Sequence, residues 1–327
     1  MKKNILITGG CGFIGTSLIK KLLEKEPNSV IRVVDNFVTG TPADLAEVAE
    51  FKQYSVDNIT EHQRGVALIE GDIRNAKLME QVCQGIDGIV HLAANTGVGP
   101  SVEDPRLDME CNVIGTFNML EAARLNGIKG FVFASSGAPA GEVEPPIHEE
   151  LPPHPVSPYG SSKLAGEGYC SSYSKTFGIN TVCLRFGNVY GPGSKHKASV
   201  VAKFIKQALD GETCMIYGDG TQTRDFIYID DLVNAIILGL EKEVGGETFQ
   251  IATGRESTVG EVAQMIADEL KSRGVDMKIE NDAPRLGDVA RNYSDTTKAK
   301  NILGWIPQMT LTTGIDNTID YFINKDK

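Results

Sequence analysis

The sequence lacks the residue clusters that mark disulfide-rich, metal-binding or membrane-spanning proteins. Its six cysteines are scattered along 327 residues without a CxxC pair, and its five histidines form no cluster. The cysteines therefore predict small buried thiols in a reducing cytoplasm, and we expect no metal site. No stretch approaches the roughly eighteen consecutive apolar residues of a membrane-spanning helix. The apolar run after Met1-Lys2-Lys3 is also too short for the core of a secretion signal.

The sequence has no long basic run either, and its formal net charge at pH 7 is -11. An acidic balance favours solubility and opposes nonspecific binding to nucleic acid or to an anionic membrane surface. We therefore expect neither nucleic acid nor a membrane as a partner. The length suffices for one large domain or for two closely joined ones.

A glycine-rich turn lies near the start of the chain. The apolar run at 4–8 is followed by GGCGFIG at 9–15, and leucine and isoleucine then recur at helical spacing. This order predicts a strand, a tight turn and a helix. Glycines in such a turn let the backbone approach a pyrophosphate at the helix N-terminus, where unpaired amides favour negative charge.

A second predicted strand, at 30–34, ends in Asp35, twenty residues beyond Gly15. A carboxylate at this place accepts hydrogen bonds from the adenosine ribose and repels a 2′-phosphate. The sequence therefore predicts NAD as the cofactor in preference to NADP.

Short apolar runs alternate with helical patterns and define the fold class. We predict further strands at 66–69, 88–92, 131–134 and 181–186, and helices at 75–83, 106–126 and 159–177. This alternation predicts an α/β protein with a doubly wound parallel sheet of the Rossmann type. Ligands bind beyond the carboxyl ends of such strands, where Asp72-Ile73, Ala93-Ala94-Asn95 and Ser135-Ser136 fall. Residues 38–65 are predicted to be an irregular excursion, with a short helical pattern around 43–51.

The dinucleotide-binding domain is predicted to span 1–185, with a return to it at about 226–250. The remaining segments, 186–225 and 251–327, are assigned to a smaller mixed α/β C-terminal lobe. No low-complexity linker separates the two parts. We therefore expect two lobes that are threaded together.

Tyr159 and Lys163 stand four residues apart on a predicted helix and so share one face of it. A phenol titrates near pH ~10 and needs neighbouring positive charge before it can act as a base at neutral pH. The same spacing also occurs at an ordinary helix start with a core tyrosine and a solvated lysine. We favour a proton-transfer pair because it follows a predicted dinucleotide-binding fold.

Together these motifs resemble the extended short-chain dehydrogenase/reductase family, and within it the nucleotide-sugar epimerases and dehydratases, most of all the UDP-hexose 4-epimerases. The matching segments are 9–15, Asp35, 72–73, 91–94, 112–116, 135–136, Tyr159 with Lys163, 185–192 and 218–231. The resemblance implies NAD-dependent epimerisation at C4 of a nucleoside-diphosphate sugar through a transient 4-keto sugar. The implied substrates are the UDP-glucose/UDP-galactose pair or the corresponding N-acetyl pair.

The resemblance also assigns roles to single residues. It implies that Tyr159 is the catalytic base, that Lys163 lowers the pKa of Tyr159 and binds the nicotinamide ribose, and that Ser136 orients the sugar oxygen. The residues it assigns to NAD binding, besides Tyr159 and Lys163, are Gly9, Gly12, Phe13, Ile14, Asp35, Asn36, Asp72, Ile73, Leu92, Ala93, Ala94 and Asn112.

The resemblance assigns the nucleotide sugar to the smaller C-terminal lobe, and the implied substrate residues lie there. They are Asn188 at the diphosphate, Tyr217 against the nucleobase, Arg224 and Arg285 on the two phosphates, Asp288 at the nucleoside ribose, and Asn292 beside the C2 substituent. Guanidinium groups suit phosphate oxygens, although a surface ion pair with Asp225 or Asp230 is the alternative for Arg224. Because Asn292 is shorter than an aromatic residue, we expect both plain and 2-acetamido sugars to fit.

Members of the family that this sequence resembles differ in what happens to the keto sugar. Dehydratases and uronic-acid decarboxylases carry a carboxylate just after the serine, whereas residues 137–141 hold no acid before Glu142. Elimination of water needs an acid and a base there, so epimerisation is favoured. Epimerases usually have Val-Tyr-Gly where this chain has Pro139-Ala140-Gly141. A sibling dehydratase, decarboxylase or epimerase at another carbon therefore remains the alternative.

A non-catalytic NAD-binding regulator is the alternative of a different class, but it would need none of Ser136, Tyr159 and Lys163. The resemblance further implies a homodimer in which the helices at 106–126 and 159–177 pair. These helices carry ample apolar surface.

Overall fold

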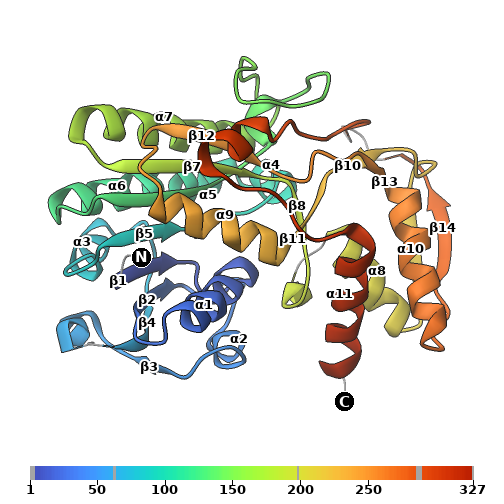
Figure 1. Cartoon of the computed structure of the whole chain (residues 1–327), viewed down its shortest axis with the longest axis horizontal. Coiled ribbons are helices and arrows are strands. Elements are labelled where there is room, and N and C mark those ends of the chain that lie inside the picture. The colour runs from blue at the N-terminus through green and yellow to red at the C-terminus, as the bar shows by residue number, and fades with distance from the viewer. Residues whose placement is uncertain (1–3, 62–63, 197–198, 285–288, 326–327) are drawn as a thin grey trace.

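The computed structural model describes residues 4–61, 64–196, 199–284 and 289–325. At its centre lies an eight-stranded sheet in the order β12-β7-β6-β5-β1-β2-β4-β3, in which all neighbouring strands are parallel (Figure 1). Its strands are β1 (Asn4–Thr8), β2 (Val30–Asp35), β3 (Phe51–Gln53), β4 (Gly65–Glu70), β5 (Gly88–His91), β6 (Gly130–Ser136), β7 (Asn180–Phe186) and β12 (Glu247–Ile251). Strands follow β1 outward in both directions, which confirms the predicted doubly wound α/β fold.

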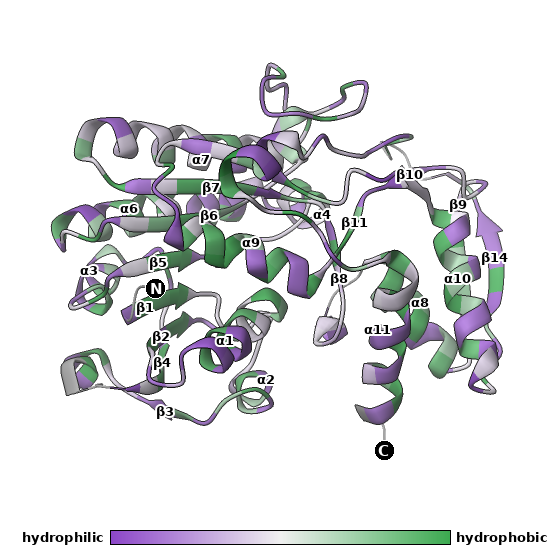
Figure 2. Cartoon of the chain, viewed as in Figure 1, coloured by the Kyte–Doolittle hydropathy of each residue, from purple (hydrophilic) through white to green (hydrophobic). Residues whose placement is uncertain are grey.

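Helices cover both faces of this sheet. On one face, α1 (Phe13–Lys25) packs against α9 (Ile229–Glu241), and on the other face lie α3 (Ala76–Val82), α6 (Gly115–Leu125) and α7 (Pro158–Phe177). The strand β1 shows the consequence, because Ile5 and Ile7 belong to the core on the α1 side and Leu6 to the core on the α3 side. A strand buried on both faces reads as a continuous apolar run, and the central strands are accordingly green in Figure 2.

Two segments differ from the sequence prediction. Residues 38–65 are not wholly irregular: besides the expected short helix, α2 (Pro42–Ala46), they contain the edge strand β3 and a 3-10 turn η1 (Val56–Glu61). The helix predicted at 106–126 is divided into α5 (Pro105–Met109), a π-helical turn η2 (Glu110–Ile114) and α6. A single π turn inside a helix often marks a functional position.

The C-terminal half builds a smaller assembly beside the sheet. The parallel pair β9 (Thr213–Tyr217) and β14 (Lys278–Asp282) lies near the helices α8 (Val200–Leu209), α10 (Val259–Ser272) and α11 (Leu311–Lys325). Two short pairs connect it to the rest: β8 (Asn188–Tyr190) with β11 (Phe226–Tyr228), and β10 (Thr223–Arg224) with β13 (Ser257–Thr258). The remaining elements are α4 (Val98–Glu103), η3 (Ala138–Ala140), η4 (Ser194–His196) and η5 (Ala299–Leu303).

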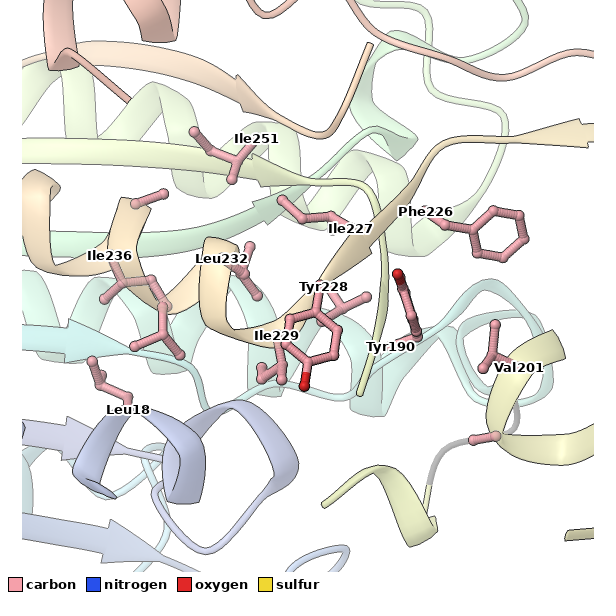
Figure 3. Packing of buried hydrophobic residues seen from close by; sticks show 14 of the residues in the cluster. Leu18, Tyr190, Val201, Phe226, Ile227, Tyr228, Ile229, Leu232, Ile236 and Ile251 are labelled. Atoms are coloured by element: carbon pink, nitrogen blue, oxygen red, sulfur yellow. The ribbon is translucent and has the colours of Figure 1, made fainter. Parts of the chain in front are cut away.

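One continuous apolar core joins the sheet to this assembly. Figure 3 shows Tyr228 and Tyr190 between Leu18 of α1 and Val201 of α8, with Phe226 above Val201 in this view. The Tyr190 and Tyr228 rings meet edge to face, with centroids 5.6 Å apart. We retain the division into two lobes as a proposal, in which the lobes share a core.

Candidate active site

The glycine turn and the start of α1 form an anion cradle. Gly12 stands at the N-cap position of α1 and offers no capping side chain, so the first-turn amides at Phe13 and Ile14 have no side-chain acceptor there. A Cβ on Gly15 would lie 2.5 Å from Gly10 Cα, and Gly9 has a φ of 69°. The close approach of backbone to backbone therefore requires these glycines, and the donor set suits a pyrophosphate.

Asp35 lies at the carboxyl end of β2, beside this cradle. Its Oδ2 accepts from Cys11 N and its Oδ1 from Phe37 N, each at 2.9 Å. Burial raises the pKa of Asp35, although these backbone hydrogen bonds lower it. Gly40, which the sequence analysis did not single out, packs so closely that a Cβ would lie 2.2 Å from Cys11 O. The loop after β2 is therefore part of the cradle.

The ends of β4 and β5 lie along the same edge of the sheet. Asp72 forms an ion pair with Arg74 at 2.7 Å, which is the main reason that its pKa is lowered, and it accepts from Asn36 Nδ2 at 3.4 Å. Ile73 is buried. The Leu92-Ala93-Ala94 segment follows β5 directly, and Ala93 N donates to Thr8 Oγ1 at 3.3 Å. The structure thus gathers the predicted cofactor residues at one sheet edge, while their NAD contacts stay a prediction.

Asn112 is also assigned to NAD binding by the resemblance, and the structure places it in the π-helical turn. It is buried, and its Oδ1 accepts from Asn95 N at 2.8 Å. Its Nδ2 lies 2.9 Å from both Asn95 O and Asp108 Oδ1. Asn112 therefore holds the loop after β5, and the Nδ2 of Asn95 in that loop is buried without a partner among the described residues.

Ser136, Tyr159 and Lys163 come together where β6 ends and α7 begins. The side chain of Ser157 caps α7 by accepting from Gly160 N at 3.1 Å, and Pro158 occupies the first helical position. The Ser136 side chain adjoins the Tyr159 phenol and lowers its pKa, and Ser136 Oγ accepts from Ala138 N at 3.2 Å. The spacing of Tyr159 and Lys163 thus brings both residues to the end of β6, as the resemblance implies.

Lys163 lies beneath the tyrosine in a buried position. Its Nζ donates to Ala134 O at 2.9 Å, and it lies 5.0 Å from the centroid of the Phe133 ring and 5.8 Å from that of Tyr159. A buried ammonium so close to aromatic faces gains cation–π stabilisation. The cation is therefore held rigidly near the phenol.

The protonation states differ from the sequence expectation. Burial raises the pKa of Tyr159 to about 12, although the adjoining Ser136 side chain lowers it. Burial lowers the pKa of Lys163 to about 8, although Asp108 and Glu167 raise it. In the protein alone, burial therefore outweighs any effect of the ammonium on the phenol, and Tyr159 is neutral at pH 7.

The segment after Ser136 folds as the 3-10 turn η3 and packs on the start of α7. A Cβ on Gly160 would lie 2.7 Å from Ala138 O, so the turn lies directly against the helix residue that follows Tyr159. Pro139 and Ala140 are buried in it, and the nearest following acid, Glu142, is exposed. Within this turn, no side chain can act as an acid or a base.

The proposed substrate residues lie in the short strands β8, β9 and β10 and, for Asn292, in a loop of the C-terminal half. Arg224 Nη1 donates to Thr223 O and Val289 O, each at 2.7 Å, and Asn292 N donates to Thr223 Oγ1 at 3.2 Å. Asn188 and Tyr217 are half-buried, and the Tyr217 ring lies 5.6 Å from Lys203 Nζ. Arg285 and Asp288 lie outside the described residues. The structure therefore brings Arg224 and Asn292 together around Thr223.

Asp225 organises these loops, and the sequence analysis considered it only as an ion-pair partner of Arg224. Its carboxylate accepts from Thr253 N, Thr253 Oγ1, Gly254 N and Ser294 N, and its carbonyl oxygen accepts from Asn188 N. It thus connects the segment after β7 with the loops at 253–254 and 292–294. Because its partners lie up to 69 positions away in sequence, no local pattern could indicate this role.

The fold and the site define an α/β protein of the Rossmann type, with a glycine-rich turn and a Ser-Tyr-Lys group at one edge of its sheet. A sequence profile described as the NAD dependent epimerase/dehydratase family matches residues 5–252. The chain belongs to this family, which confirms the resemblance found in the sequence. In the described part of the chain, no helix is long and apolar enough to cross a bilayer, and no group of three or more acidic, His or Cys side chains is placed to hold a metal.

Individual relatives match over nearly the full length. The chain is 35% identical to the UDP-glucose 4-epimerase of Mycolicibacterium smegmatis, covering 98% of this chain and 99% of that protein. It is similar to the crystal structure of UDP-glucose 4-epimerase with UDP-glucose from Thermotoga maritima, with a TM-score of 0.88, 34% identity and coverage of 99% and 100%. It is also similar to the Thermus thermophilus UDP-glucose 4-epimerase complex with NAD, with a TM-score of 0.85, 34% identity and coverage of 98% of each chain.

Proposed function

We propose that this protein is an NAD-dependent epimerase that inverts C4 of a UDP-sugar. The observation that carries the proposal is the turn after Ser136, which packs beside Tyr159 and contains no acidic or basic side chain. Elimination of water from the keto sugar would need such groups near C5 and C6. Without them, return of the hydride to either face of the keto sugar is favoured over elimination of water.

The residues at the sheet edge fit NAD. The glycine turn and the first-turn amides of α1 would hold the pyrophosphate, and Asp35 the adenosine ribose. Lys163 would bind the nicotinamide ribose. When bound, NAD supplies the hydride acceptor and a positive charge that opposes the effect of burial on the phenol.

The protein side chains handle the proton. Tyr159 takes the proton from the 4-hydroxyl as its phenolate, and Lys163 supplies a fixed positive charge 5.8 Å from the tyrosine ring centroid. Ser136 adjoins Tyr159 and donates to the developing ketone oxygen. The same groups return the proton after the hydride has been returned.

The substrate assignment rests on the loops around Thr223 and on the relatives. Arg224 would bind the diphosphate, Asn188 would contact it, and Tyr217 would pack against the base. The Mycolicibacterium and Thermotoga relatives are UDP-glucose 4-epimerases, which supports a UDP-sugar. Asn292 borders the proposed C2 pocket, so we expect both UDP-glucose and UDP-N-acetylglucosamine to be substrates.

Proton NMR of the protein with UDP-, dTDP-, GDP- and CDP-sugars tests the reaction. We expect inversion at C4 of a UDP-sugar with no net formation of NADH. Loss of water or of carbon dioxide would instead identify a dehydratase or decarboxylase and overturn the proposal. Turnover of UDP-glucose without turnover of UDP-N-acetylglucosamine would contradict only the role of Asn292.

We further propose a homodimer in the cytoplasm. The π turn and α7 expose apolar side chains: Ile114 and Phe177 are each 43% exposed and Tyr169 is 39% exposed. Phe117 connects the two helices, since its ring lies 5.6 Å from that of Tyr169. Sedimentation of the wild type at the mass of a dimer, and of Ile114→Glu at that of a monomer, would support this interface, whereas a monomeric wild type would refute it.

A further inference from the structure

Asp108 is a buried carboxylate that the reaction scheme above does not use. It lies on α5, is 1% exposed, and its Oδ1 accepts from Asn112 Nδ2 at 2.9 Å, one helical turn further along. Its Oδ2 is buried and has no hydrogen-bond partner among the described residues. A buried carboxylate with an unsatisfied oxygen costs stability, so its presence calls for a physical reason.

Hydrogen bonds connect Asp108 to the start of the catalytic helix. Asn112 Nδ2 lies 3.1 Å from Ser162 Oγ, and Ser162 Oγ lies 3.0 Å from Tyr159 O. Burial raises the pKa of Asp108, although the nearby charge of Lys163 lowers it. Three successive hydrogen bonds, from Asp108 to Asn112, from Asn112 to Ser162 and from Ser162 to Tyr159 O, thus connect the carboxylate to the backbone just before Lys163.

The other titratable groups near Lys163 are either paired with an opposite charge or neutral. The carboxylate of Glu167 on α7 accepts from Arg185 Nε at 2.8 Å and from Arg185 Nη2 at 2.7 Å. His91 on β5 is buried between Thr8 and Thr116, and burial lowers its pKa to about 3, so it is neutral.

Cys170 on α7 also faces Lys163, but burial raises its pKa, so this thiol is neutral too. For Asp108, by contrast, no salt bridge is found within the described part of the chain. The negative charge of Asp108 is therefore not offset by an ion pair, and it acts on Tyr159 and Lys163.

We propose that Asp108 is a positioning residue that sets the pH range in which Tyr159 and Lys163 work, through its buried charge and its hold on Asn112 and Ser162. This inference rests on the proposed function. A negative charge favours the ammonium of Lys163 and disfavours the phenolate of Tyr159. The carboxylate of Asp108 thereby helps to keep the buried Lys163 charged. It also raises the pH at which Tyr159 ionises.

The substitution Asp108→Asn separates the charge from the structure. The amide oxygen can still accept from Asn112 Nδ2, and the new NH₂ would stand where no partner is now bound. Asp104→Asn is the matched control, because Asp104 caps the same helix, is exposed, and would keep its cap as asparagine. Thermal unfolding of both variants checks that the fold persists.

The first measurement is the titration of Lys163 by NMR of the protein with ¹³C-labelled lysines, with the resonance assigned by Lys163→Met. It needs neither substrate nor turnover, so it is independent of the proposed function. We expect Asp108→Asn to move the Lys163 titration to lower pH by roughly half a unit or more, and Asp104→Asn to leave it unmoved. An unmoved or raised midpoint in Asp108→Asn would overturn the inference.

The second measurement is the pH profile of the turnover identified by the NMR panel. The acid limb reports ionisation of Tyr159 and the alkaline limb loss of the Lys163 charge, so removal of the carboxylate should move both limbs to lower pH. A purely structural role would lower the rate without moving the limbs together, and this result would also refute the inference. Failure to find any turnover would refute the proposed function while leaving the titration decisive for Asp108.

Discussion

Glu167 and Arg185 form a buried ion pair beneath the active site, and its removal should be costly. Glu167 Oε1 and Oε2 accept from Arg185 Nε and Nη2, and Oε1 also accepts from Ser135 Oγ at 2.6 Å. The two side chains are only 7% and 6% exposed. Arg185 Nη1 is already buried without a partner within the described residues. The substitution Glu167→Ala would leave Arg185 Nε and Nη2 buried without this acceptor as well.

The expected loss can be worked from these contacts. Removal of one member of a buried pair costs about 3–5 kcal/mol, because the other charge stays buried and uncompensated. Loss of the Ser135 hydrogen bond adds about 1 kcal/mol. We therefore expect the free energy of unfolding of Glu167→Ala to fall by about 4–6 kcal/mol. Replacement of both residues, as Glu167→Leu with Arg185→Met, should recover much of this loss because no buried charge remains.

Urea unfolding followed by circular dichroism measures these differences. Arg106→Ala is the control, since Arg106 forms an ion pair with Glu110 at 2.6 Å but its side chain is 79% exposed. We expect no measurable loss in this control, because water screens the exposed pair. If Glu167→Ala unfolded within about 1 kcal/mol of the wild type, or the double variant were no better than the single one, the reasoning would be refuted.

Three further predictions follow from the site and the core. Tyr159→Phe should keep NAD and nucleotide binding and lose turnover by several orders of magnitude, with Tyr321→Phe on α11 as control; near-normal rates would remove Tyr159 from the mechanism. Gly40→Ala should abolish NAD retention, measured by nucleotide content after purification, because the Cβ would lie 2.2 Å from Cys11 O; full retention would contradict this. Burial raises the pKa of the Cys83 thiol to about 12, above its unfolded value of about 9. The contribution of this thiol to stability is therefore complete below pH ~9 and is lost as the pH rises toward 12. Cys83→Ala should therefore flatten the fall of unfolding free energy above pH ~9, and an unchanged slope would count against it.

Local patterns were enough to predict the cofactor half of the fold. The strand, glycine turn and helix at the start of the chain, and Asp35 at the end of the next strand, depend on backbone geometry and on spacings of at most a few turns. The pairing of Tyr159 with Lys163 likewise follows from helical periodicity. Such features are set by neighbours in sequence, and the structure places them as expected.

Long-range contacts account for what the sequence did not show. The predicted continuous helix at 106–126 contains a π turn, in which Asn112 bonds to Asn95, Asp108 and Ser162. Asn95 and Ser162 are distant from Asn112 in the sequence, so helical propensity cannot predict these contacts. The same holds for Gly40, whose requirement for glycine comes from Cys11, on the other side of β2 in the sequence.

The amino-acid sequence was sufficient to predict the doubly wound fold and NAD as the cofactor, and its resemblance to a family pointed to Ser136, Tyr159 and Lys163. Tertiary packing was needed to establish how these groups are charged. Burial raises the pKa of Tyr159 to about 12 and lowers that of Lys163 to about 8. The physical reason is that desolvation and the charge of Asp108 arise from segments brought together by folding, and no spacing along the chain encodes them.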